Sequence, residues 1–186
     1  ETTVGDIWSS FYPGIYRAND IIDGVPKSNT LSDVIKNQAV GEALFLRGMY
    51  YFYMVNLYGD VPLIIGTDLK TNELAPRTAS AEIYTQITKE LERASELLPA
   101  TYPGGTDGVR ANKWAATALL ARVKLYLGKY AEAEKLSTDV IGQSKVYVLS
   151  EDLNTVFVKR STDVIFAFDV SFAGYTTVGL NTGTTA

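Results

Sequence analysis

The residues best suited to hold a ligand lie near the start of the chain, where Trp8 is followed by Asn19 and Asp20. Oligosaccharides bind to flat aromatic faces through their C–H surfaces, and to planar amides and carboxylates through their hydroxyl groups. Trp8 precedes the apolar stripe of its predicted helix and lies near the end of that helix, where a ring can stay exposed. We therefore predict a ligand-binding role for Trp8 and Asn19. The alternative for Trp8 is the commoner one, packing in the core or at an interface.

Two charged side chains, Glu42 and Arg47, interrupt an otherwise apolar helical pattern. Because they are five residues apart, they point about 140° away from each other around a helix and cannot pair with each other. They could hold a ligand, but buried charges need partners, so we predict that each pairs with a neighbouring element. The aromatic run 50–53 with Tyr58 and the ring of Trp114 could form sugar platforms, but such positions favour packing roles.

The composition lacks the residue types that many catalytic mechanisms need. The chain of 186 residues has no histidine and no cysteine, which excludes Ser-His-Asp catalysis, thiolate chemistry, disulfides and most zinc sites. Asp152, Asp163 and Asp169 could supply carboxylates for glycoside hydrolysis, but nothing in their spacing selects a pair. We therefore predict that the protein is not an enzyme and uses no cofactor and no metal.

Charge and hydropathy argue against a nucleic-acid-binding protein and against a membrane-spanning helix. A net charge of −4 gives no basic footprint for nucleic acid, and a composition of 46% hydrophobic and 20% charged residues indicates a globular protein. No apolar run approaches the roughly 18 residues of a membrane helix. Residues 1–3 carry no basic-then-apolar signal, which leaves open a removed leader and anchor or an excised part of a protein.

Apolar periodicity predicts the helices that must position these residues. The expected ranges are 6–25, 35–57, 81–98, 111–127 and 130–141. Pro13 is expected to kink or interrupt the first helix. Gly59 is expected to end the second helix, with Pro62 keeping residues 61–64 extended, and Ser80 is expected to cap the third.

A weak internal repeat indicates how these helices stack. The sequence Leu-Tyr-Gly at 57–59 ends the second helix as Tyr-Leu-Gly at 126–128 ends the fourth, an offset of 69 residues, which corresponds to about two tetratricopeptide (TPR) repeats. Residues 127–133 also match a TPR turn, because Gly128 permits a tight turn and Ala133 lets two helices approach closely. An unrelated four- or five-helix bundle is the alternative.

The pattern changes at residues 163–172, where every second residue is apolar and aromatic or β-branched. This period of two predicts a half-buried β-strand. The fold class is therefore all-α, with TPR-like helical repeats over residues 6–142 and a short β segment within 155–172, all in a single domain of residues 1–186. Because a strand needs a partner and this sequence offers few, we expect the chain to be cut from a longer protein.

Three stretches in this order resemble the SusD/RagB family of nutrient-binding outer-membrane lipoproteins. They are W-x3-Y-x2-I-x-R-A-N-x-I-I at 8–22, G-E-A-L-F-L-R-G-x-Y-Y-F continuing to L-Y-G-D-V-P-L within 41–63, and W-A-A-x-A-L-L-A-R-V-x-L-Y-x-G-x-Y at 114–130. Residues 163–166 are similar to the strand that follows these helices in the family. The second stretch is specific, whereas the TPR-like hairpin alone is not. Gly48 departs from the alanine usual in the family, and the family's chains are several times longer.

The resemblance implies a SusD-like α/α superhelix on the extracellular face of the outer membrane of Bacteroidetes-type bacteria, held by a lipid anchor that is not present in this chain. It implies a SusC-type TonB-dependent transporter as partner, and non-catalytic capture of oligosaccharides, or in some members peptides, for uptake. A TPR adaptor that grips a partner peptide and a carbohydrate-active enzyme are the alternatives. In such proteins ligand contacts come largely from loops elsewhere, so we expect this chain alone to bind its nutrient weakly or not at all.

Overall fold

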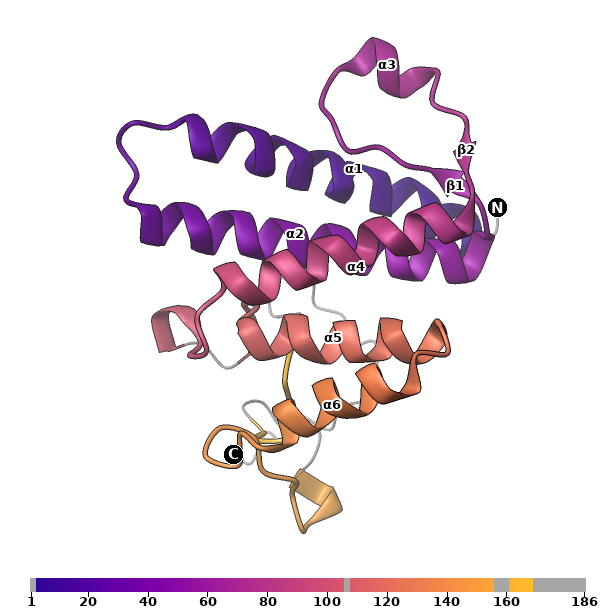
Figure 1. Cartoon of the computed structure of the whole chain (residues 1–186). Coiled ribbons are helices and arrows are strands. Elements are labelled where there is room, and N and C mark those ends of the chain that lie inside the picture. Colours follow the sequence, from indigo (N-terminus) through magenta and orange to yellow (C-terminus); the bar gives the residue numbers. More distant parts are fainter. Residues whose placement is uncertain (1–2, 106–107, 156–160, 169–186) are drawn as a thin grey trace, which may run out of the picture.

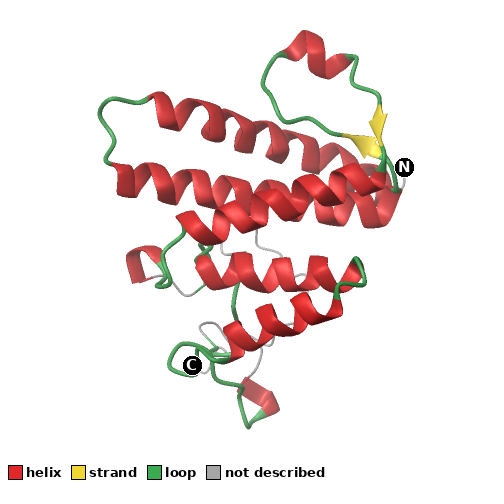
Figure 2. Cartoon of the chain, viewed as in Figure 1, coloured by secondary structure: helices red, strands yellow, loops and turns green. Residues whose placement is uncertain are grey.

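The computed structural model describes residues 3–105, 108–155 and 161–168. The long helices in these residues lie in one stack, and a smaller lobe projects from one end of it (Figures 1 and 2). The principal elements are, in chain order, α1 (Thr3–Gly24), α2 (Asp33–Tyr58), β1 (Val61–Pro62), α3 (Leu69–Glu73), β2 (Arg77–Thr78), α4 (Ser80–Leu97), α5 (Lys113–Tyr126) and α6 (Tyr130–Ile141).

Each long helix packs on the next long helix along the chain. α1 packs on α2, α2 on α4, α4 on α5, and α5 on α6. Figure 1 shows this succession running across the molecule from α1 to α6. Such stacking of consecutive antiparallel helices is the arrangement of helical-repeat proteins, and it confirms the predicted all-α array.

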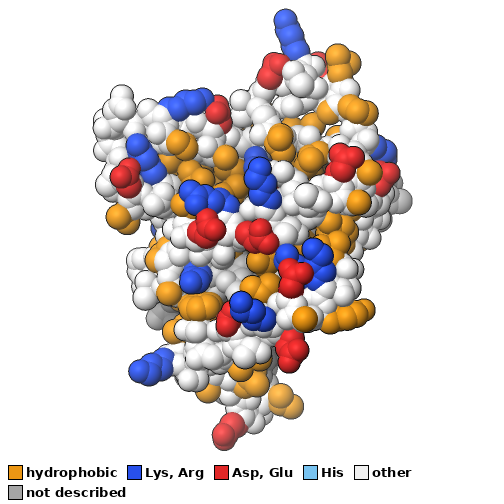
Figure 3. Space-filling view, viewed as in Figure 1, with side chains coloured by type: hydrophobic (Ala, Val, Ile, Leu, Met, Phe, Trp, Pro, Cys, Tyr) orange, Lys and Arg blue, Asp and Glu red, His pale blue; other side chains and the backbone are white. Residues whose placement is uncertain are grey.

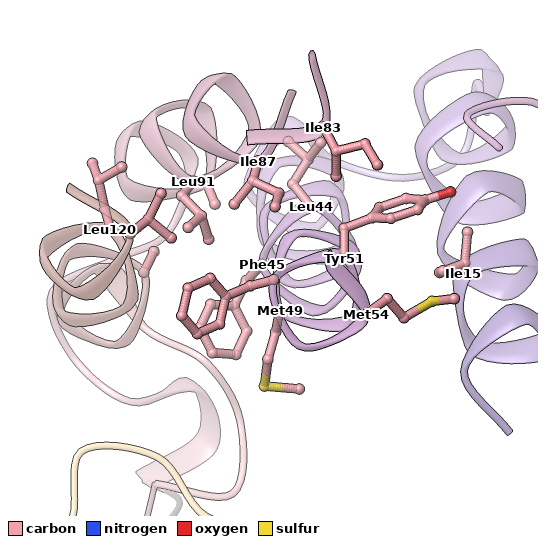
Figure 4. Close-up of a cluster of buried hydrophobic side chains, with 14 of the residues drawn as sticks. Ile15, Leu44, Phe45, Met49, Tyr51, Met54, Ile83, Ile87, Leu91 and Leu120 are labelled. Carbon is pink, nitrogen blue, oxygen red and sulfur yellow. The ribbon is translucent and has the colours of Figure 1, made fainter. Parts of the chain in front are cut away.

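The core lies on both sides of α2. Ile15 of α1 packs on one side, while Ile87 and Leu91 of α4 pack on the other, with Leu120 of α5 beyond them (Figure 4). This explains why α2 carries two rows of apolar residues. At Gly48 a Cβ atom would lie 3.2 Å from Leu91 Cδ2, so the glycine allows α4 to approach α2 closely.

Of the two outcomes expected at Pro13, an interruption of the first helix does not occur. α1 continues through this proline and is not interrupted by it. The missing N–H of Pro13 leaves the Ser9 carbonyl without its helical partner. Both residues lie on the exposed side of α1, where water can satisfy that carbonyl, and this is why the helix tolerates the proline.

The start of α4 also differs from its prediction. Ser80 is the first residue of the helix and not its N-cap. The cap comes from Asp60, whose Oδ1 accepts hydrogen bonds from the Ser80 backbone N–H at 2.8 Å and from the Ser80 hydroxyl at 2.6 Å. These bonds to the Ser80 hydroxyl and backbone hold the pKa of the Asp60 carboxyl below its ordinary value.

Residues 59–79 form an excursion between α2 and α4. β1 and β2 pair antiparallel at its root, with Val61 opposite Thr78 and Pro62 opposite Arg77. β1 confirms the extended conformation predicted around Pro62, whereas the sequence patterns predicted neither α3 nor β2. Beyond its root the excursion projects from the helical stack as the lobe that carries α3 (Figure 1).

The predicted C-terminal strand is wrong for residues 161–168, which contain no strand. Residues 156–160 and 169–172 of that prediction lie outside the described residues. In the described part, the chain lies against the helices: the ring of Phe166 is 4.9 Å from that of Phe45, measured between centroids. Its neighbour Ile165 packs on the core as well, so the alternating sequence does not produce alternating burial here.

Candidate functional site

Trp8 lies in an aromatic cluster near the N-terminal end of α1. Its ring centroid is 5.1 Å from that of Tyr12 and 5.0 Å from that of Tyr58, which it meets edge-on at 87°. The guanidinium carbon of Arg77, at the root of the excursion, lies 5.5 Å from the Trp8 ring centroid. We call these four residues the Trp8 cluster. It joins α1, the end of α2 and β2.

The Trp8 cluster combines apolar rings with fixed polar groups. The Tyr12 hydroxyl donates to the Pro62 carbonyl at 3.0 Å. Burial raises the pKa of the Tyr12 phenol, and the opposing effect of the Arg77 charge is smaller, so the phenol keeps its proton and its bond. The Arg77 side chain is exposed, whereas Trp8 is half-buried. A partly accessible indole beside an exposed guanidinium is the kind of aromatic and polar combination that binds sugars.

Asn19, the other predicted ligand-binding residue, does not lie beside Trp8. It lies eleven residues further along α1, a separation of about 16 Å along the helix axis. Asn19 is 1% exposed. Its Nδ2 donates to the carbonyls of Ile64 and Gly66 at 3.1 and 2.9 Å, and its Oδ1 accepts from Arg47 Nη1 at 2.6 Å. The amide is therefore engaged inside the fold and offers no group to a ligand.

Glu42 and Arg47 each pair with a neighbouring element, as predicted. Arg47 donates through Nε and Nη2 to Glu90 Oε1 of α4, at 3.0 and 2.7 Å. Arg47 and Glu90 are 4% and 2% exposed, so this is a buried ion pair. Glu42 lies nearer the surface and accepts from Arg110 Nη2 at 2.8 Å. Both charges on α2 are thus satisfied by protein groups.

The other aromatic candidates are mainly packing residues. Tyr51 and Phe52 are buried in the core, which confirms the packing interpretation for this part of the aromatic run. Tyr53 is 42% exposed and borders the surface. Trp114 is half-buried in the first turn of α5, with the Lys113 ammonium 5.2 Å from its ring centroid.

The aspartates considered for hydrolysis are engaged locally where the structure describes them. Asp152 accepts from the Asn154 backbone and side chain at 2.9 and 2.8 Å, and Asp163 accepts from Ser161. Asp169 lies outside the described residues. Within the described ranges, no three side chains of the metal-ligating types gather in one place, and no helix is both long and apolar enough to span a membrane.

The sequence patterns did not predict that Glu90 and Tyr51 make buried polar contacts. Glu90 follows Ile87 by three residues and precedes Ala94 by four, so its helical spacing already placed a carboxylate on the apolar face. The hydroxyl of Tyr51 accepts from the Ile64 N–H at 2.6 Å and donates to the Ile64 carbonyl at 3.1 Å. No local pattern indicates that contact, because the partner belongs to an irregular segment.

The surface beside the Trp8 cluster is formed by the excursion. Its side chains Ile65, Leu69 and Leu74 are 55%, 65% and 84% exposed. Figure 3 shows hydrophobic and charged side chains together on this projecting lobe. Two hollows lie elsewhere, one of about 480 Å³ between α5 and α6 and one of about 250 Å³ between α1 and α2, and neither is lined by Trp8 or Asn19.

The sequence is similar to that of SusD-like proteins. A SusD-like family model, described as starch-binding and associating with the outer membrane, matches residues 1–125. SusD-like protein P25 of Formosa agariphila is 29% identical over 143 residues, which cover 76% of this chain and 27% of the relative. The starch-binding protein SusD of Bacteroides thetaiotaomicron is 30% identical over 120 residues, which cover 62% of this chain and 21% of the relative.

Solved structures agree with the sequence comparison. A SusD-like protein from Bacteroides fragilis superposes with a TM-score of 0.77 at 32% identity, covering 88% of this chain and 33% of that structure. A laminarin-binding SusD-like protein superposes with a TM-score of 0.73 at 31% identity, covering 80% of this chain and 33% of that structure.

The chain spans between a fifth and a third of the length of these relatives. The family match nevertheless takes in 125 of its 186 residues. The matched region holds the Trp8 cluster, the buried Arg47–Glu90 pair and the whole excursion. The stacked helices, the specific motif on α2 and these matches lead to one conclusion: the chain belongs to the SusD-like family.

Proposed function

We propose that this chain serves non-catalytic binding of nutrient oligosaccharides at the bacterial cell surface, for uptake through a SusC-type TonB-dependent transporter. The match of residues 1–125 to a family described as starch-binding and associating with the outer membrane carries this proposal. Two relatives support it by name, the starch-binding protein SusD and the laminarin-binding SusD-like protein. On this proposal the natural protein is held on the outer face of the outer membrane by a lipid anchor.

Within this chain, we place the ligand contact at the Trp8 cluster. The cluster supports this placement because it pairs the half-buried indole of Trp8 with the exposed guanidinium of Arg77. An indole face suits the C–H surface of a sugar ring, and a guanidinium donates to hydroxyl oxygens. Only part of the indole is free of Tyr12 and Tyr58, so the contact area is small and the binding by this chain alone is weak.

Affinity electrophoresis tests the proposal, because it detects weak binding. The chain is run through native gels that contain starch or laminarin, and its retardation is compared with a gel without polysaccharide. We expect retardation in at least one polysaccharide, and Trp8→Ala should lose most of it. Trp114→Ala is the matched control, since it removes the other indole at a distance from the excursion, and it should keep the retardation. Circular dichroism checks that both variants remain helical.

The outcomes separate the functional classes. No retardation in any polysaccharide, combined with capture of peptides, would replace glycan binding by the peptide-binding alternative. Release of reducing ends from the polysaccharide would show an enzyme and contradict the non-catalytic role. Equal retardation of the Trp8→Ala variant and the unmodified chain would move the glycan contact away from the Trp8 cluster.

A further inference from the structure

A buried series of polar contacts runs from α4 to the excursion. Glu90 of α4 binds Arg47 of α2, and Arg47 binds Asn19 of α1. Asn19 in turn donates to the backbone carbonyls of Ile64 and Gly66 in the excursion. All three side chains belong to residues that are 4% exposed or less. The series therefore connects three helices of the scaffold with one irregular segment, without passing through solvent.

The order of donors and acceptors in this series fixes the orientation of the Asn19 amide. Its Oδ1 must face Arg47, because a guanidinium can only donate. Its Nδ2 must then face the two carbonyls of Ile64 and Gly66, which can only accept. An amide rotated by 180° would place an oxygen against two carbonyl oxygens. Because Arg47 can only donate, it selects the orientation of the Asn19 amide that holds the excursion.

Glu90 holds the guanidinium in place from the other side. Its Oε1 accepts from Arg47 Nε and Nη2 and also from Gln86 Nε2 at 2.6 Å. Its Oε2 is buried without a hydrogen-bond partner in the described residues. An unpaired buried carboxylate oxygen is costly, so apolar packing alone does not account for an acid at this position. One oxygen of Glu90 orients Arg47, and the other is left unsatisfied.

The same segment of the excursion is held by two phenols. Tyr12 donates to the Pro62 carbonyl, and the Tyr51 hydroxyl exchanges two hydrogen bonds with the backbone of Ile64. Beyond this root the lobe exposes large apolar side chains, including Leu74 at 84%. The position of the excursion is therefore determined at its root, by polar side chains of the scaffold.

We propose that Glu90, Arg47 and Asn19 are positioning residues. They act through the backbone of Ile64 and Gly66 to hold the excursion beside Trp8. They contact no ligand themselves. What the excursion is positioned for rests on the proposed function, namely recognition of a glycan beside Trp8. The position of the excursion is measurable without any ligand, so the two ideas can fail separately.

The variant Asn19→Asp separates positioning from core packing. Aspartate has the shape of asparagine and keeps an acceptor for Arg47, but it puts a carboxylate oxygen where Nδ2 donates to Ile64 and Gly66. Amide hydrogen exchange of the 186-residue chain is followed under native conditions. We expect exchange at Ile64, whose N–H is bonded to the Tyr51 hydroxyl, to be faster by about tenfold or more, with exchange in α5 and α6 unchanged. Asn19→Ser, which removes the amide without adding a charge, should act in the same direction.

Leu91→Ala is the control, because it makes a cavity in the same core and removes no polar group of the series. It should lower global stability and leave exchange at Ile64 no faster than in the rest of the core. Unchanged exchange at Ile64 in both Asn19 variants would overturn the proposal, and so would an equally selective increase in Leu91→Ala.

The affinity gel supplies the functional arm of the test. Asn19→Asp should reduce retardation by polysaccharide, whereas Leu91→Ala should not while it remains folded. If the Asn19 variants release the excursion but bind glycan as before, the excursion is not part of glycan recognition and the positioning role in binding is overturned. If the unmodified chain binds no polysaccharide, the proposed function fails, and the exchange data still decide whether these residues position the excursion.

Discussion

The two helical hairpins α2/α4 and α5/α6 begin their connections alike and continue them differently. Gly59 comes directly after α2 and Gly128 comes just after α5, and both glycines have a φ of 71°. α6 then starts at Tyr130, whereas α4 starts only at Ser80, after the excursion. A glycine with positive φ ends the first helix in both hairpins, so this local signal does not determine the length of the connection to the second helix.

The two hairpins differ in buried side chains at corresponding positions of their first helices. At the offset of 69 residues, Ala116 and Leu120 of α5 correspond to Arg47 and Tyr51 of α2. All four residues are buried. Arg47 and Tyr51 need polar partners: Glu90 and Asn19 supply those of Arg47, and the backbone of the excursion supplies those of Tyr51. Ala116 and Leu120 need none, which is compatible with a tight turn. The root of the excursion is thus held by buried polar residues of the helices.

The largest effect is expected when Arg47 is replaced by the alanine of the second hairpin. Arg47→Ala leaves the Glu90 carboxylate buried without a countercharge and removes the donor to Asn19. We expect a loss of about 3–5 kcal/mol in the free energy of unfolding, measured by urea denaturation. Arg122→Ala, on the exposed surface of α5, is the matched control and should change stability by less than about 0.5 kcal/mol. A loss of similar size in both variants would remove the distinction between the hairpins.

A smaller effect is expected at Tyr51. Tyr51→Phe keeps the ring and leaves the Ile64 N–H without its partner in a buried position, at a cost of about 1–3 kcal/mol in unfolding free energy. Tyr130→Phe removes a hydroxyl from a residue that is 69% exposed and should have almost no effect. Urea denaturation of both variants gives the comparison. Equal stabilities of Tyr51→Phe and the unmodified chain would show that the excursion is held without this hydroxyl.

The pH dependence of stability gives a second test of the role of Tyr51. Burial raises the pKa of the Tyr51 phenol, so the folded chain binds that proton more tightly than the unfolded chain. This contribution to stability is complete below the ordinary tyrosine value of 10.0 and is lost as the pH rises above it. Stability of the Tyr51→Phe variant should therefore fall less steeply above pH 10 than that of the unmodified chain.

The contrast between the hairpins also shows what the sequence can predict. Apolar spacing placed all five long helices, and it indicated that Arg47 needs a partner on another element, because both depend on local periodicity. It could not place Asn19, which neighbours Ala18 on the edge of the apolar stripe of α1. The partners of Asn19 are backbone carbonyls of an irregular segment, and no side-chain pattern encodes their position. The strand predicted from the alternation at residues 163–168 is wrong for a related reason, because alternating residues form a strand only where a partner strand exists.

A weaker effect is expected for the ion pairs that Lys124 of the second hairpin makes. Lys124 lies 2.7 Å from Glu132 and 3.3 Å from Glu92, and both carboxylates are about half exposed at 52%. Lys124→Met should cost about 1 kcal/mol or less in unfolding free energy, because water screens exposed partners. Lys135→Met, on the exposed side of α6, is the control. A loss as large as that of Arg47→Ala would make the two hairpins equally dependent on buried charge.

The alkaline limb of the stability curve tests this ion-pair network separately. Burial alone would lower the pKa of Lys124, but the bonds and charges of Glu132 and Glu92 outweigh it and raise the pKa. The contribution is therefore complete below the ordinary lysine value of 10.5 and is lost as the pH rises through the raised value. Lys124→Met should lack this loss, as measured by urea denaturation at a series of pH values.

The smallest effect, and the only gain in stability, is expected at the start of α6, the second helix of the second hairpin. Asp60 caps α4 from the excursion, and the residue at the corresponding offset is Lys129, which precedes α6 and makes no side-chain cap. Lys129→Asp puts an acceptor and a negative charge at this N-terminus, and should stabilise the chain by about 0.5 kcal/mol. The lost pair with Glu132 spans 3.9 Å between exposed groups and contributes little. Lys129→Ala removes the cation without adding an acceptor, so thermal unfolding should rank it between the unmodified chain and Lys129→Asp. If Lys129→Asp is instead less stable than Lys129→Ala, the backbone at residue 129 does not hold the Asp side chain where it can cap α6. Capping in the first hairpin would then depend on the excursion, which returns the chain to Asp60 at the start of α4.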